Sequence, residues 1–173
     1  MLFPLVGLAR WFVKNEARAL DAEGVIDFTQ RRYMIDFGGY AVLHADGRQW
    51  GGASRRRLAT LPTEKHKSPV PLWLTDLLDG VRAATEVGIE PVRGTSCRHF
   101  QADVDPAHAS SVLSGDWPTD FGARPVDVWI DDAHVRRIRA RVQARAQTLE
   151  LWDFGLSVDE LDWTRLPSFR PEP

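Results

Sequence analysis

The stretch PVDVWIDDAHVRRIRARVQARAQTLELWDFG, residues 125–155, alternates apolar and basic residues through its middle, and this pattern decides the fold. As a strand, one face would hold Ile138, Ala140, Val142, Ala144 and Ala146, and the other Arg137, Arg139, Arg141, Gln143 and Arg145. The segment could also form a helix, because alanine, arginine and glutamine are good helix formers. One stripe of that helix would hold Val135, Ile138, Val142 and Leu149. The alternation favours the strand, because a helix would scatter the arginines around its whole circumference.

The residues on either side of this alternation predict an antiparallel meander. Before it, residues 126–130 alternate as a strand, and residues 131–134 are polar and typical of a turn. After it, Leu149 and Leu151 fall out of phase with the earlier apolar positions, so we expect a turn or bulge between residues 143 and 147. The arginines then form the solvated face of a sheet.

Length and composition allow one domain with a hydrophobic core. The chain has 173 residues, of which 43% are hydrophobic, and a formal net charge of −2. No global basic field exists to attract a polyanion, so nucleic-acid binding is not expected. We expect a single domain over 1–173, with an N-terminal helix or extension over 1–22, a sheet-and-helix body over 24–166 and a tail over 167–173.

The N-terminal segment favours a docked helix containing Trp11, Phe12 and Leu20 over a targeting sequence. Its apolar start has no basic residues ahead of it, no small-residue cleavage site and no cysteine to lipidate. No segment of the chain approaches about 18 consecutive apolar residues, so no membrane-spanning helix is expected.

Short strand patterns follow from Gly24. Residues 30–37 alternate between two faces, which predicts one long or two abutting strands. One face holds Arg31, Tyr33, Ile35 and Phe37, and the other face holds Gln30, Arg32, Met34 and Asp36. Asp46-Gly47 lies between two extended segments and predicts a tight hairpin turn. Residues 54–68 are polar, include three consecutive arginines, and predict a surface loop.

Residues 71–88 predict the principal helix of the chain. Pro71 would open it and Gly88 would close it. Its apolar side chains recur at spacings of three and four, at Leu74, Leu77, Leu78, Val81, Ala84 and Val87. A helix with so apolar a face must pack on the sheet.

A turn, a strand and a short helix are expected next. Residues 93–95 form the turn, and Asp105-Pro106 begins a helix that ends near Gly115. The intervening strand would carry Arg98, Phe100, Ala102 and Val104 on one face, and Cys97, His99 and Gln101 on the other.

No strong catalytic, phosphate-binding or metal-binding motif occurs in the sequence. Cys97 and His99 lie two apart on one strand face, but strand geometry separates their Cβ atoms by about 6–7 Å. We therefore expect a partly buried thiol and not an activated nucleophile. The other histidines, His44, His66, His108 and His134, have no metal-ligand spacing. No metal or cofactor is expected.

Three segments carry a family resemblance: residues 71–105, residues 125–142 and the sequence TLELWDFG at residues 148–155. They resemble the actinobacterial LppX/LprG lipoproteins, within the LolA-like lipoprotein-carrier superfamily. The resemblance covers roughly residues 22–166. It implies an α+β fold, in which a curved antiparallel sheet, or half-barrel, has helices packed on its concave face and encloses an apolar cavity.

The resemblance also implies a ligand site and an extracytoplasmic location in the cell envelope. The helical lid would hold Trp73, Leu77, Leu78 and Val81, and the sheet side of the cavity would hold Phe100, Val104, Val128, Ile130, Leu149 and Leu151. This chain departs from the family in having no recognisable secretion signal and no lipidated cysteine.

Two functions therefore remain open. The first is non-enzymatic binding or carriage of a hydrophobic small molecule, such as a lipid or acyl chain, with peripheral membrane contact. The second is a protein-interaction module with a filled core, whose partner surface lies on loops 54–68 and 115–124. The aromatic residues Trp117 and Phe121 of the second loop would be buried by such a partner.

Overall fold

The computed structural model describes residues 3, 5, 8–15, 20–36, 40–45, 48–53, 59–60, 70–112, 125–142 and 145–156. The chain divides into two compact units. Unit 1 comprises Met1–Leu5, Val13–Leu20 and Lys67–Leu151, and unit 2 comprises Val6–Phe12, Asp21–His66 and Trp152–Pro173. The expectation of a single domain over 1–173 stays a prediction.

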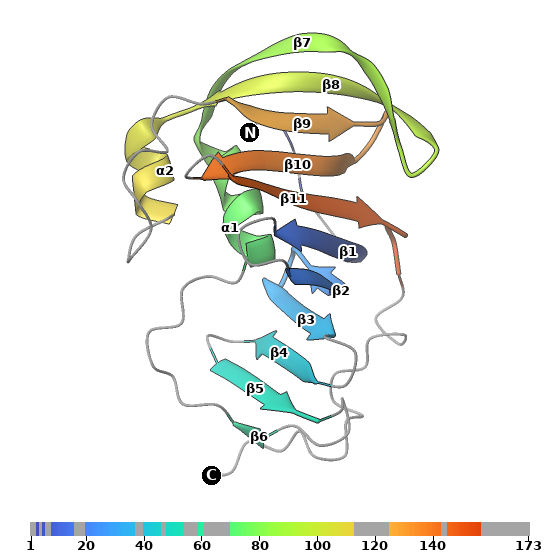
Figure 1. Cartoon of the computed structure of the whole chain (residues 1–173), viewed down its shortest axis with the longest axis vertical. Coiled ribbons are helices and arrows are strands. Elements are labelled where there is room, and N and C mark those ends of the chain that lie inside the picture. The colour runs from blue at the N-terminus through green and yellow to red at the C-terminus, as the bar shows by residue number, and fades with distance from the viewer. Residues whose placement is uncertain are drawn as a thin grey trace. The chain divides into compact units, whose positions relative to one another are not determined.

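Unit 1 contains three helical segments and most of the longer strands (Figure 1). The helical segments are α1 (Val70–Asp76), the 3-10 helix η1 (Leu77–Gly80) and α2 (Pro106–Val112). The strands are β7 (Val81–Val92), β8 (Thr95–Val104), β9 (Val126–Ile130), β10 (Val135–Val142) and β11 (Arg145–Trp152).

Unit 2 contains the remaining strands. Strand β1 (Leu8–Asn15) is divided between the two units, and so are β2 (Leu20–Asp27) by its first residue and β11 by its last. The others are β3 (Arg32–Asp36), β4 (Ala41–Ala45), β5 (Arg48–Gly52) and β6 (Ala59–Thr60). Over the described residues, the strands follow the order β6-β5-β4-β3-β2-β1-β11-β10-β9-β8-β7 in one antiparallel sheet. The predicted fold class, an α+β half-barrel, is confirmed.

The arginine-bearing segment is a strand, as the alternation predicts. Strand β10 pairs with β9 on one side and with β11 on the other, both antiparallel. The register joins Val142 to Arg145, so the expected turn falls at residues 143–144, which lie outside the described residues. This turn exchanges the predicted faces of two residues. Ala146 pairs with Arg141 and leaves the apolar face, whereas Arg145 pairs with Val142 and lies on the apolar face instead of the arginine face.

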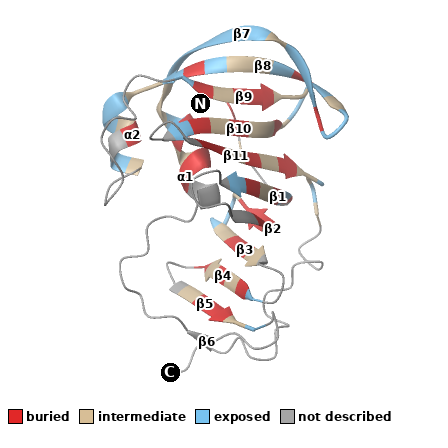
Figure 2. Cartoon of the chain, in the orientation of Figure 1, coloured by how far each residue is buried: buried red, intermediate tan, exposed pale blue. Residues whose placement is uncertain are grey.

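One face of the unit 1 sheet is apolar, and we call it the apolar face. Phe100 pairs with Val128, Val128 with Ile138, and Ile138 with Leu149, so a continuous apolar row crosses four strands. The last three of these side chains have no solvent exposure. Figure 2 shows buried positions along β9, β10 and β11. Helix α1 contacts β10, and its continuation η1 contacts β8.

The predicted helix over residues 71–88 is wrong in its second half. Helical structure ends at Gly80, and Val81 begins a strand that pairs with β8 over ten residue pairs. Val81 and its β-branched successors suit the pleated surface of a strand. The leucines that follow the helical period within α1 and η1 remain buried, whereas Ala84 and Val87 are exposed on β7.

The predicted N-terminal helix is also wrong, because that segment forms β1 and β2. In β1, Trp11 and Val13 are buried, while Arg10 and Lys14 are exposed. This burial follows the period of two that is typical of strands.

In unit 2, strands β2 to β5 form a meander around a small core. The buried members of this core are Val25, Met34, Ala41, Leu43, Ala45 and Trp50. The pairing of Ala45 with Arg48 confirms the hairpin predicted at Asp46-Gly47, although the two turn residues lie outside the described residues. Tyr33 and Met34 are both buried, so β3 does not show the clean alternation that its sequence predicts.

The alternating pattern predicted over residues 30–37 forms a strand only from Arg32, because a turn occupies the preceding residues. The carboxylate of Asp27 accepts hydrogen bonds from the backbone N–H groups of Thr29 at 2.9 Å and Gln30 at 3.0 Å. Arg31 then adopts a positive φ of 51°. An Asp side chain that bonds the backbone two residues ahead is typical of a turn.

The turn over residues 93–95 and the helix start at Asp105-Pro106 are confirmed. Arg93 and Gly94 take φ values of 48° and 80° between paired strands β7 and β8. Oδ1 of Asp105 accepts a hydrogen bond from the N–H of Ala107 at 2.8 Å, as an N-cap does. The predicted end near Gly115, and the whole of loop 115–124, lie outside the described residues, as does most of loop 54–68.

Candidate functional site

Six of the ten predicted site residues are buried, and the other four are half-buried. Trp73, Leu77 and Leu78 lie on α1 and η1 with exposed fractions of 3%, 0% and 1%. On the sheet, Val128, Leu149 and Leu151 are fully buried, and Phe100, Val104 and Ile130 are half-buried. Val81, expected in the helical lid, instead begins strand β7 and is half-buried.

The register brings the six sheet residues to the same face. Phe100, Val128 and Leu149 belong to the row described above. The other three are Val104, Ile130 and Leu151. Each lies two or four residues along its strand from a member of that row, and residues separated by an even number project to the same face. The six residues that the resemblance places on the sheet side of a cavity therefore share one face, and their contact with a ligand stays a prediction.

A pocket of about 340 Å³ opens at one end of the apolar face, beside the edge strand β7. It is lined by Phe3, Ala84, Arg98, Phe100, Ile130 and Asp131. Its volume falls at the lower end of the range of about 300–1,000 Å³ that is usual for small-molecule sites. The rings of Phe3 and Phe100 lie 6.1 Å apart, at an angle of 59°.

Only Phe100 and Ile130 of this pocket belong to the predicted site. Arg98 was placed on the face of Phe100 by the alternation but not identified as a site residue, and it pairs with Ile130 across β8 and β9. Phe3 comes from a segment far away in the sequence, so no local pattern indicates its position. Ala84 was missed because it was assigned to a helix.

Both charged side chains of the pocket are neutralised by neighbouring groups. Nη2 and Nε of Arg98 donate to Oε2 of Glu86 at 2.6 and 3.1 Å, and the Arg98 guanidinium lies 4.9 Å above the Phe100 ring centre. This hydrogen bond holds the pKa of the Glu86 carboxyl below its ordinary value. The pocket therefore presents Arg98 as an ion pair stacked on an aromatic ring.

The carboxylate of Asp131 is likewise compensated, by hydrogen-bond donors from the turn between β9 and β10 and from Arg136. Its Oδ1 accepts the backbone N–H groups of Ala133 at 2.8 Å and His134 at 2.6 Å, and Arg136 donates to its Oδ2. Burial raises the pKa of Asp131, but these donors together outweigh it and leave the pKa below the ordinary value. The described lining thus offers an apolar surface with no uncompensated charge.

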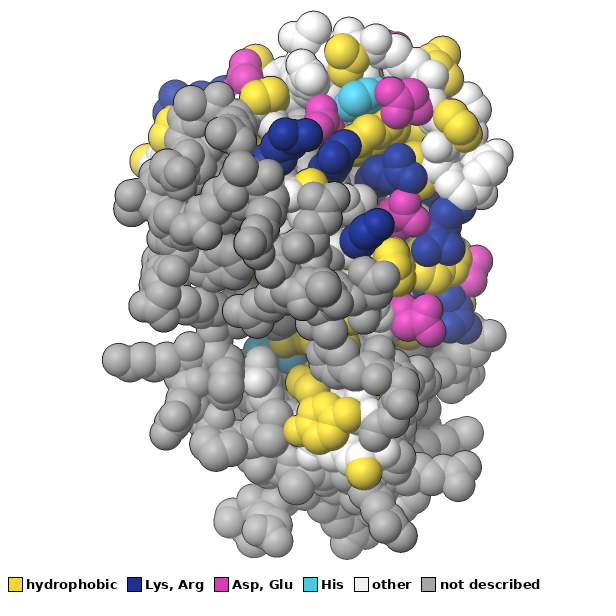
Figure 3. Space-filling view, viewed as in Figure 1, with side chains coloured by type: hydrophobic (Ala, Val, Ile, Leu, Met, Phe, Trp, Pro, Cys, Tyr) yellow, Lys and Arg dark blue, Asp and Glu magenta, His cyan; other side chains and the backbone are white. Residues whose placement is uncertain are grey.

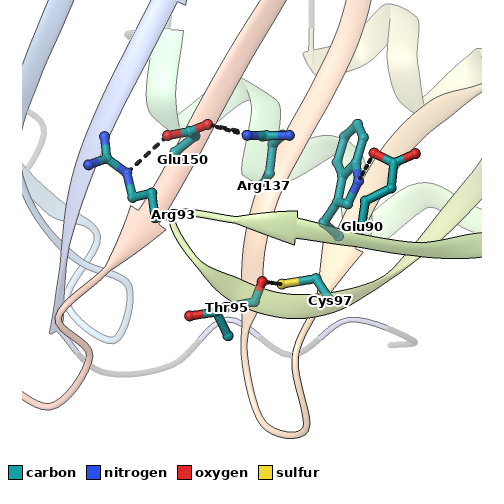
Figure 4. Close-up of polar contacts among 7 residues, drawn as sticks. Glu90, Arg93, Thr95, Cys97, Arg137 and Glu150 are labelled. Atoms are coloured by element: carbon teal, nitrogen blue, oxygen red, sulfur yellow. Dashed lines mark hydrogen bonds and ion pairs between the residues drawn. The ribbon is translucent and has the colours of Figure 1, made fainter.

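The opposite face of the unit 1 sheet is polar and internally paired. Figure 3 shows acidic and basic side chains interleaved over this part of the molecule. The carboxylate of Glu150 forms ion pairs with Arg137, at 2.7 Å from Nη2, and with Arg93, at 2.9 Å from Nε. The indole N–H of Trp129 donates a hydrogen bond to Glu90 at 3.0 Å (Figure 4). Arg139 and Arg141 project to the same face as Arg137, so these three of the alternating arginines belong to the polar face of the sheet.

Cys97 and His99 do not form a nucleophilic pair. The Cys97 thiol donates to the backbone carbonyl of Thr95 at 3.4 Å, and burial raises the pKa of this thiol. His99 is bonded instead to Glu90 at 3.2 Å and to Asp127 at 3.1 Å. A protonated thiol that faces a carbonyl is a weak nucleophile.

The remaining histidines are dispersed, as expected from their spacing. His44 lies on β4, His108 on α2 and His134 at the turn before β10, while His66 lies outside the described residues. Within the part of the chain that the structure describes, no three His, Cys, Asp or Glu side chains are grouped to hold a metal ion. No helix among the described residues has the length and apolar character to cross a membrane.

Comparison with known proteins identifies the fold. No family model and no curated protein sequence matches this chain. The lipoprotein LppX of Mycobacterium tuberculosis superposes with a TM-score of 0.62 at 16% identity, covering 88% of each chain. LprF of Mycobacterium bovis gives 0.61 at 14% identity, covering 88% of this chain and 87% of its own. The chain therefore has an LppX/LprG-like fold, as the resemblance of its sequence implies.

Proposed function

We propose that this protein binds one hydrophobic ligand, a lipid or an acyl chain, on the apolar face of unit 1 and carries it without chemical change. The observation that supports this most directly is the pocket beside Phe100 and Ile130. The charged side chains that line this pocket are paired with neighbouring protein groups. Phe100 is the first member of the apolar row, whose other members are fully buried. The shared fold with LppX, which is named a lipoprotein, is consistent with this proposal.

Burial of apolar area supplies the binding free energy in this proposal. Each square ångström of apolar surface removed from water contributes about 25 cal/mol. No charged headgroup is needed, because Arg98 and Asp131 already have partners. The tail of the ligand would enter at Phe100 and lie between the sheet and the α1–η1 segment.

The predicted ligand-binding residues keep their roles in this proposal, with one change. Trp73, Leu77 and Leu78 form the cover on the helical side, and the six predicted sheet residues form the floor. Val81 moves from the cover to the edge strand. Separation of cover from floor would admit a ligand longer than the pocket.

The protein would act outside the cytoplasm, at the cell envelope, by analogy with the lipoproteins that share its fold. Peripheral contact with a membrane would deliver or collect the ligand. Fractionation of the native host, with the full-length gene product detected by antibody, tests the location. Recovery only with cytoplasmic markers would contradict it.

Native mass spectrometry after gentle purification, and displacement of an environment-sensitive lipid dye, test ligand binding. The wild type should take up the dye and release it to added fatty acids. Trp73→Asp buries a charge in the cover and should abolish uptake. Tyr40→Asp, at a side chain that is 44% exposed in unit 2, is the matched control and should leave uptake intact.

A second variant keeps the test informative if Trp73→Asp fails to fold. Phe100→Trp fills part of the pocket with an apolar ring and should weaken dye binding by about tenfold while preserving the circular dichroism spectrum. If the folded wild type takes up no dye and carries no amphiphile, the proposed function is wrong.

A protein-interaction module is the second candidate, and exposed apolar side chains on the edge strand β7 favour it. Val87 and Ile89 are 53% and 69% exposed. Ile89→Lys should then abolish partner binding and leave dye uptake unchanged. A partner surface on loops 54–68 and 115–124 stays a prediction.

A further inference from the structure

Gln147 on β11 is a fully buried amide on the apolar face. Its exposed fraction is 0%, and it pairs with Ala140 of β10, whose side chain is also buried. Leu149 lies two residues further along the same strand, so both side chains project to the same face. Neither Oε1 nor Nε2 of Gln147 has a hydrogen-bond partner.

Among the described residues, Nε1 of Trp11 and Nε of Arg32 are also buried without a hydrogen-bond partner, but the indole is largely apolar and the guanidinium has further donors. The polar residues that are buried as a whole differ from Gln147. Within the described ranges, Asp27 and Thr75 are the remaining polar residues of this class. Asp27 accepts two backbone N–H groups, and Thr75 is engaged in a contact of its own. A buried amide that has lost its water and gained no partner costs free energy, and native proteins rarely retain one without a reason.

A glutamine side chain offers both donors and an acceptor. Its natural complement is therefore a group that also offers both, as a hydroxyl, an undissociated carboxylic acid or an amide does. The side chains of Ala140 and Leu149 beside the amide are apolar. Arg145, two residues before Gln147 on β11, belongs to the same face. The preference for an uncharged group therefore rests on the paired donor and acceptor of the amide.

We propose that Gln147 is the polar anchor of the ligand site, and that it selects a single-chain amphiphile with an uncharged hydrogen-bonding group. This inference rests on the proposed function. The group would pair with the amide of Gln147, and the chain would extend along the apolar row toward the pocket at Phe100.

The geometry of the sheet sets the length of this ligand. Strands β8 and β11 are separated by two others, and neighbouring strands lie about 4.8 Å apart, so Gln147 lies about 14 Å across the sheet from Phe100. A ligand that reaches both residues needs one long chain. A pocket of about 340 Å³ suits one such chain better than a lipid with several.

Paired probes test this selectivity. Cetyl methyl ether has a methyl group in place of the hydroxyl hydrogen of cetyl alcohol, so it keeps the oxygen acceptor and lacks the donor. Each probe is titrated against the bound lipid dye. The wild type should bind the alcohol about tenfold more tightly than the ether. Gln147→Met keeps the length and volume of the side chain without its amide and should bring the two affinities together.

Thr148→Val is the matched control, because Thr148 pairs with Arg139 and therefore faces the other side of the sheet. It should retain the wild-type preference. Gln147→Leu replaces Gln147→Met if the methionine variant does not fold, as judged by circular dichroism.

The outcomes separate this inference from the proposed function. If neither probe displaces dye because no dye binds to the wild type, the proposed function fails and the inference fails with it. If both probes bind but the wild type does not distinguish them, or if Gln147→Met keeps the preference, only the inference is overturned. In that case an interior water molecule satisfies the amide.

Discussion

The imidazole ring of His99 stacks on the indole ring of Trp129, with their centres 4.2 Å apart and their planes 11° apart. The two residues face each other across β8 and β9. Glu90 bonds both rings, and Asp127 bonds the other nitrogen of His99. One cluster therefore links β7, β8 and β9 on the polar face of unit 1, opposite the proposed ligand site.

The Trp129 indole is expected to be a major source of stability for unit 1. It is 4% exposed and packs against Val92 and Cys97, so Trp129→Ala should lower the free energy of unfolding by about 3–5 kcal/mol. Trp129→Phe keeps a ring but loses the N–H that bonds Glu90, and should lose about 1.5–3 kcal/mol. Urea titration followed by circular dichroism measures both variants. Equal stability of the wild type and Trp129→Phe would show that this hydrogen bond contributes nothing.

The strands that carry an alternating pattern could be predicted from the sequence, because period two is a local property. The arginine segment and its out-of-phase continuation located β10, β11 and the turn between them. The same turn decides the position of Gln147. A continued strand would have put Ala146 on the apolar face, whereas the hairpin puts Gln147 there.

The helix over 71–88 was overextended because its leucines and valines fit a helical period through Val87. The strand conformation of Val81–Val92 depends on pairing with Thr95–Val104, which competes with the local preference. For a related reason, only two of the six residues that line the pocket were predicted as site residues. Phe3 lies far from the other lining residues in the sequence, and only the folded structure brings Phe3 and Phe100 together at the pocket.

Asp131 should make stability depend on pH in the acidic range. Its pKa in the folded protein lies below the ordinary value of 3.8, so its contribution is fully present above that pH. The contribution is lost as the pH falls through the lowered pKa, because protonation then breaks the contact with Arg136. Asp131→Asn should cost about 1–2 kcal/mol at neutral pH and less in acid.

Urea midpoints measured from about pH 6 to about pH 2 test this dependence. Asp132→Asn is the control, because Asp132 is the exposed neighbour in the same turn. A constant difference between Asp131→Asn and the wild type over the whole range would contradict the assignment.

Cys97 should react slowly with thiol reagents while the protein is folded. Its side chain is 1% exposed, and burial raises the pKa of the thiol, so little thiolate is accessible at neutral pH. Labelling with iodoacetamide should proceed only as fast as unit 1 opens, and full labelling should follow the addition of denaturant. Rapid labelling of the native protein, at the rate of a free thiol, would restore Cys97 as a candidate nucleophile.

Gly80 allows the end of η1 to approach α2, and replacing it should destabilise unit 1. A Cβ added at Gly80 would lie 2.3 Å from Cδ2 and 2.9 Å from Cβ of His108, which is closer than packed atoms allow. The ring of His108 is also fixed by its Nε2, which bonds the carbonyl oxygen of Asp76 at 2.8 Å, so the side chain cannot move away without losing that contact. Gly80→Ala should therefore lower the free energy of unfolding by about 1–3 kcal/mol. The double variant Gly80→Ala with His108→Ala removes the whole clashing ring and leaves only the Cβ at position 108, so it should be less destabilised than the sum of the two single variants. Additive losses in urea titrations would mean that the two residues do not contact each other in solution.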